Sequence, residues 1–63
     1  MNQNKLDLEK KSALVVIIHI RKSIKVKGEL SEIWVKYLNN NSRMVEVMKM
    51  VDKEFMDGIS KVL

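Results

Sequence analysis

The chain has 63 residues, no Cys, one His and a formal net charge of +4, because twelve Lys and Arg outnumber eight Asp and Glu. A domain of this size buries only about 60% of its unfolded surface. Without Cys it has no disulfide or thiolate metal site to stabilise it, so we expect it to form oligomers. The basic excess favours a polyanionic partner, while 46% hydrophobic residues exclude disorder of the whole chain.

Residues 5–20 fit either a strand or a helix. The run at 13–20, ALVVIIHI, has the composition of a strand. A helical stripe fits equally well and consists of Leu6, Ala13, Ile17, Ile20 and Ile24. The apolar run is far shorter than the about 20 residues that cross a bilayer, and the acids at Asp7 and Glu9 argue against a signal peptide. We therefore expect a cytoplasmic protein without a membrane partner.

Residues 22–27 predict a short strand. Polar and β-branched residues alternate here up to Gly28, which is the period of a strand. Ile24 and Val26 would face a core, and the opposite face would carry Ser23, Lys25 and Lys27. A helix would scatter the lysines around its axis. Since a lone strand needs a partner and no hairpin turn precedes it, we expect pairing with a second copy of the chain.

The remainder predicts two helices. The first has an apolar face and ends at the Asn residues 39–41; its face consists of Leu30, Ile33, Trp34, Tyr37 and Leu38. The second begins at Ser42 as N-cap. Its stripe consists of Met44, Val47, Met48, Val51, Phe55, Ile59 and Val62. Trp34 and Tyr37 are expected in the core, whereas Met50 and Met56 lie off the stripe and are candidates for a protein interface.

The order of strand, helix and helix resembles the ribbon-helix-helix family of DNA-binding dimers, which includes the Arc and MetJ repressors. The resemblance is carried by residues 22–27, by Glu29-Leu30 and Ser42-Arg43 at the helix starts, and by Glu46-Val47-Met48 and Phe55, which are similar to omega-type plasmid repressors. It implies a mainly α fold with one short strand, forming an intertwined homodimer through an intermolecular antiparallel β-ribbon. Residues 22–63 would be this domain, and residues 1–21 an N-terminal arm or added element.

The resemblance also implies a sequence-specific DNA-binding regulator, a repressor from a plasmid or phage, whose paired strands enter the major groove of double-stranded DNA. The residues that would read bases are Ser23, Lys25 and Lys27. Those that would bind phosphates are Arg21, Lys22, Ser42 and Arg43. The dimer core would consist of Ile24, Val26, Leu30, Trp34, Val47, Val51 and Phe55.

The chain departs from this family upstream of the strand. Continued backwards, the ribbon would place Val15 and Ile17 against DNA, so residues 13–20 are expected to pack elsewhere and are a candidate surface for a protein partner. The alternative is an all-α three-helix bundle, in which residues 5–27 form one long helix and the protein binds and inhibits or tethers another protein. Nothing in the sequence indicates an enzyme, a cofactor or a metal site, and the single His19 is expected to be a packed or half-exposed core residue, not a catalytic base.

Overall fold

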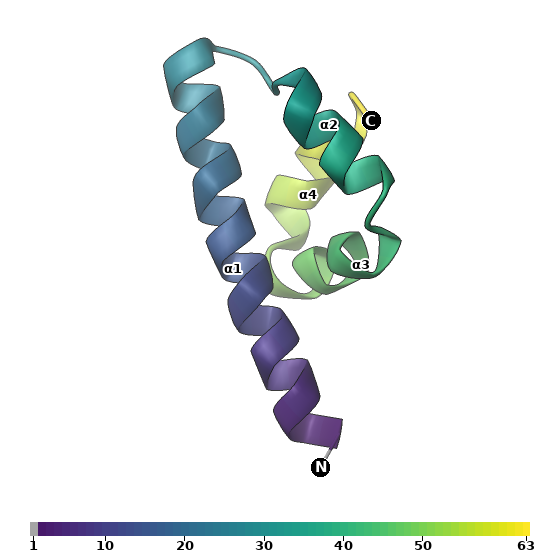
Figure 1. Ribbon diagram of the computed structural model, residues 1–63. Helices are drawn as coiled ribbons and strands as arrows, with labels where there is room; N and C mark the ends of the chain where they lie inside the picture. The colour runs from purple at the N-terminus through teal and green to yellow at the C-terminus, as the bar shows by residue number, and fades with distance from the viewer. Residues whose placement is uncertain (1) are drawn as a thin grey trace.

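The computed structural model describes residues 2–63, with side chains from residue 4 onward, and contains four helices. They are α1 (Asn2–Lys27), α2 (Glu32–Asn39), α3 (Ser42–Val51) and α4 (Lys53–Ser60). Figure 1 shows the three short helices gathered on one side of α1. The long axis of the molecule is 40 Å, which is the length of α1, since its 26 residues rise by about 1.5 Å each.

The predicted strand is wrong, because no residue between 2 and 63 belongs to a strand and residues 22–27 form the end of α1. An isolated strand leaves its backbone groups unpaired, whereas a helix satisfies them within the segment. The β-ribbon, the intertwined dimer built on it and the ribbon-helix-helix architecture are therefore corrected to an all-α fold. The alternative with a single helix over residues 5–27 is confirmed, although the bundle has four helices instead of three.

Helix α1 ends at Gly28, which the sequence had marked as the end of a strand. The Gly28 backbone has φ of +80°, a left-handed conformation that glycine adopts without steric cost. Its amide donates a hydrogen bond to the carbonyl oxygen of Ile24 at 2.7 Å. This is the usual role of glycine just after a helix, and it turns the chain back toward α2.

All four helices contribute to one core. The buried residues are Ala13, Ile17 and Ile20 from α1, Leu38 from α2, Val47 and Met48 from α3, and Met56 and Ile59 from α4. Most of the residues predicted for a dimer core lie at its edge, within one chain: Ile24, Leu30, Trp34, Val51 and Phe55. Val26 points away from it and is 83% exposed.

The C-terminal third is two helices, not the single one predicted from residue 42 onward, because the chain is extended at Asp52 (φ −148°, ψ 79°). The Asp52 carboxylate accepts a hydrogen bond from the Phe55 amide at 3.2 Å and so caps α4. The break changes the phase of the apolar stripe. Met56 becomes fully buried, while Val62 is 62% exposed.

The first short helix is confirmed with a shift of two residues, and Trp34 and Tyr37 pack against the core as predicted. Their rings meet edge to face, with centroids 5.5 Å apart. Ser42 is the first residue of α3, and Asn41 stands in the cap position instead. The Asn41 side-chain amide donates a hydrogen bond back to the carbonyl oxygen of Tyr37 at 2.6 Å, which fixes the turn between α2 and α3.

Candidate functional site

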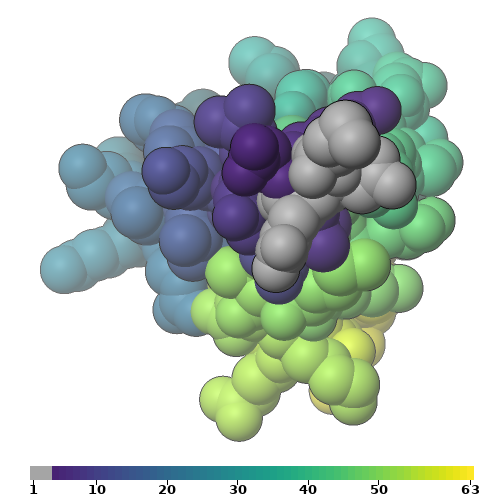
Figure 2. Space-filling model, turned by 90° about the horizontal axis from the view of Figure 1, so that it is seen from below, coloured from purple at the N-terminus to yellow at the C-terminus, as the bar shows by residue number. Residues whose placement is uncertain are grey.

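Helix α1 carries two apolar faces, of which only one is covered. The side opposite the core exposes Leu8 (63%), Leu14 (46%), Val15 (52%) and Ile18 (51%). In Figure 2 the blue and purple atoms of α1 lie at the left and centre of the view, and the green and yellow atoms of the later helices lie against them below and to the right. We call this side of α1 the outer face. It consists of these four apolar residues and three exposed lysines on the same side of the helix: Leu8, Lys11, Leu14, Val15, Ile18, Lys22 and Lys25.

The outer face follows from the spacing of its residues. Steps of three and four keep side chains on one side of a helix that turns by about 100° per residue. The stripe with this spacing is Leu8, Lys11, Val15, Ile18, Lys22 and Lys25. Its first part is mostly apolar and its last part is basic. Residues 10–27 include six Lys or Arg and no Asp or Glu, so no acid within this part of α1 offsets the charge.

Two arginine ion pairs hold α1 against the shorter helices. Near the start of the helix, Arg43 donates two hydrogen bonds to Glu9, each 2.9 Å long. The hydrogen bond from Arg43 holds the pKa of Glu9 below its ordinary value, and the same bond raises the pKa of Arg43. This bidentate pair joins residues 34 positions apart in the sequence.

Farther along α1, Arg21 donates to Asp52 at 2.6 Å, and its guanidinium lies 4.4 Å from the centroid of the Phe55 ring. The hydrogen bond from Arg21 and then that from the Phe55 amide lower the pKa of Asp52. Asp52 thus fixes α1 and caps α4 with one carboxylate. Both contacts orient α1 with its inner face on the core and its outer face toward solvent.

The predicted base-reading residues do not share a face. On a helix, residues two apart differ by about 200° in direction, so Lys25 lies on the outer face while Ser23 and Lys27 point elsewhere. Of the predicted phosphate-binding residues, Arg21 and Arg43 are engaged with carboxylates of the same chain. The remaining two are exposed on different helices, Lys22 on α1 and Ser42 at the start of α3.

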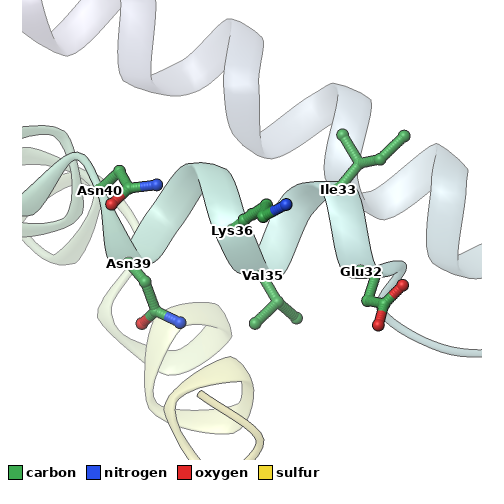
Figure 3. A pocket seen from close by; sticks show the side chains of 6 residues that line it. All are labelled: Glu32, Ile33, Val35, Lys36, Asn39 and Asn40. Carbon is green, nitrogen blue, oxygen red and sulfur yellow. The ribbon is translucent and has the colours of Figure 1, made fainter.

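The hollow along α2 offers little for a small molecule. Its volume is about 450 Å³, and it is lined by Glu32, Ile33, Val35, Lys36 and Asn39 of α2 and by Asn40, the residue that follows. Figure 3 shows these side chains projecting in different directions from this single helix, so they do not converge on a ligand. Within the described side chains, no three His, Asp or Glu gather into a metal site. His19, expected to be a packed or half-exposed core residue, is exposed.

Comparison of the chain with protein-family models, with curated proteins and with solved structures finds no match. Among residues 2–63, no helix combines the length and apolar character needed to cross a membrane. The sequence had marked residues 13–20 as a surface for a protein partner, and Leu14, Val15 and Ile18 fall within that range. Leu8 was missed, although the steps of seven and three that link it to Val15 and Ile18 were a signal for it.

Proposed function

We propose that this chain is a small helical protein that binds another protein through the outer face of α1. The observation that carries the proposal is the row of four apolar side chains, each between 46% and 63% exposed, on a helix face that no other helix covers. Exposed apolar area costs about 25 cal/mol per Å² relative to burial. An apolar patch rimmed by polar residues is characteristic of interaction sites.

The outer face fits a protein better than DNA. Its centre consists of Val15 and Ile18, whose side chains offer no hydrogen bonds to phosphates or to base edges. The two arginines, the residues best suited to phosphate and guanine, lie in ion pairs with Glu9 and Asp52. The net charge of +4 still favours an anionic partner, and an acidic protein satisfies both the charge and the apolar surface.

The proposal is tested by site-specific photo-crosslinking in cells of the source organism. A benzophenone side chain replaces Val15 on the outer face or, as a control, Met50, which is 58% exposed on α3. We expect a discrete protein adduct from position 15 and none from position 50, and we expect it to disappear when Ile18→Asp is added. Adducts with nucleic acid alone, or no adduct at position 15, would contradict protein binding.

A further inference from the structure

We infer that the partner presents an amphipathic helix that lies antiparallel to α1, with acidic residues in its first turns and apolar residues after them. This inference rests on the proposed function and specifies the chemistry of the partner. It starts from the asymmetry of the outer face along its length. The apolar side chains lie between Leu8 and Ile18 with Lys11 among them, and beyond Ile18 the stripe continues with Lys22 and Lys25, beside the exposed Val26.

A helix matches the shape of this surface. The steps of the outer stripe alternate between three and four residues, which is the spacing along the contact line of two packed helices. From Leu8 to Lys25 the stripe covers 17 steps, or about 25 Å at the helical rise of 1.5 Å per residue. A second helix can follow it over this whole length, because no other helix crosses that side of α1 (Figure 1).

A second copy of this chain, packed in register along the whole outer face, brings like charges together. If two α1 helices packed antiparallel about the midpoint between Val15 and Ile18, Lys11 would face Lys22 of the other copy. A parallel pair would place each lysine opposite its own copy. Either arrangement brings like charges together in the contact line, which is unfavourable. The partner therefore carries the opposite charge where α1 carries lysine.

The direction of the partner follows from the helix dipole. Two of the three lysines of the outer face, Lys22 and Lys25, lie toward the C-terminal end of α1, and Lys25 is in its last turn. Acidic side chains are stabilising in the first turn of a helix and destabilising in the last. A partner helix with acids at its N-terminal end, placed antiparallel, brings those acids to Lys22 and Lys25. Its apolar residues then continue over Ile18, Val15 and Leu8.

Three labelled synthetic peptides test this inference by fluorescence anisotropy with the full chain. Each has three heptads with Leu at the contact positions. One carries Glu in the first two turns, the second carries the same Glu residues in the last two turns, and the third has Gln in place of Glu. Since two surface charge pairs distinguish the first peptide from the others, we expect it to bind about tenfold more tightly. Added salt should reduce the difference.

Charge reversal tests whether Lys22 and Lys25 cause the difference in affinity between the peptides. The double variant Lys22→Glu/Lys25→Glu should lose the preference for the first peptide, and a peptide with Lys in its first two turns should restore binding to this variant. The matched control is Lys36→Glu/Lys49→Glu, which makes the same change of net charge at exposed positions of α2 and α3. It should keep the preference of the original chain.

The outcomes separate this inference from the proposed function. Equal affinity for all three peptides, lost in Ile18→Asp, would overturn the acidic and antiparallel partner while keeping protein binding at the outer face. No binding of any peptide would overturn the inference, and the crosslinking experiment then decides the proposed function independently. Tighter binding to phosphatidylglycerol vesicles or to a short DNA duplex than to the first peptide would also overturn it.

Discussion

The inner and outer faces of α1 are built from similar residues but have different surroundings. Ile17 and Ile20 on the inner face are 3% and 0% exposed, whereas their near neighbours Val15 and Ile18 are 52% and 51% exposed. Hydrophobicity alone does not distinguish these neighbours. Their direction around the helix does, because the short helices pack on one side only (Figure 1). An apolar run in a small protein can thus serve its own core and a binding surface at once.

The largest expected effect comes from shortening the same side chain on either face. Ile20→Ala should lower the free energy of unfolding by about 2–5 kcal/mol, a large part of the about 3–9 kcal/mol typical of this length. Ile18→Ala, the matched change on the outer face, should alter it by less than about 0.5 kcal/mol. Urea unfolding followed by circular dichroism measures both. Similar losses for the two variants would mean that the outer face is covered in the isolated protein.

The next largest effect on stability is expected from replacing Gly28, the residue that ends α1. Gly28→Ala should destabilise the protein by about 1–2 kcal/mol, because an L-residue is disfavoured in the left-handed conformation. Gly58→Ala, inside α4, should stabilise it by up to about 1 kcal/mol. Neither new methyl group meets an atom within 4 Å, so crowding does not affect the comparison. A stabilising Gly28→Ala, seen as a higher melting temperature, would contradict the helix end described above.

Two substitutions at Asp52 separate the forces that keep the inner face on the core. Asp52→Asn retains an oxygen that can accept the Phe55 amide but loses the ion pair with Arg21. Asp52→Ala loses both. We expect the melting temperature to fall in the order Asp, Asn, Ala, with circular dichroism as the measurement. If the Asn and Ala variants melted together, the cap of α4 would contribute nothing.

Acid should produce the smallest effect, since both ion pairs are at the surface. The pKa values of Glu9 and Asp52 are lowered in the folded state, so the unfolded chain binds more protons and stability rises with pH. Their contribution is complete above the unfolded values of about 4 and is lost as the pH falls through the lower folded values. The double variant Glu9→Gln/Asp52→Asn should show a flatter dependence of unfolding free energy on pH. An unchanged slope would show that neither ion pair contributes to the free energy of unfolding.

The inner face of α1 was one of two open alternatives in the sequence, and the end of that helix was predicted wrongly. The helical alternative for residues 5–20 contained Ala13, Ile17 and Ile20, which are the buried residues of α1, but spacing alone did not decide between helix and strand. Residues 22–27 were wrongly assigned to a strand because six residues are too few to separate a period of two from a helical period. Ile24 continues the stripe of Ala13, Ile17 and Ile20. The helical spacing therefore extends over a longer segment than the alternation of residues 22–27, and this favours the helix.

The break at Asp52 was hidden by a step of four between Val51 and Phe55, which suits a continuous helix. The available signal was Asp52 followed by Glu54, since acids at a cap and in the first turn mark a helix start. The two arginine pairs could not be read from the sequence, because their partners are 31 and 34 residues away. These pairs depend on how the helices cross, and the spacing of residues within one helix gives no information about that crossing.

The placement of the methionines has a consequence for oxidative damage. Met48 and Met56 are fully buried, whereas Met50 is 58% exposed. Peroxide can convert Met50 to its sulfoxide in the folded protein, but it reaches the other two only when the core opens. A polar sulfoxide at Met48 or Met56 then opposes refolding. The rate at which Met48 and Met56 oxidise therefore measures how often the bundle opens. Met50, in the same helix as Met48, is the internal reference.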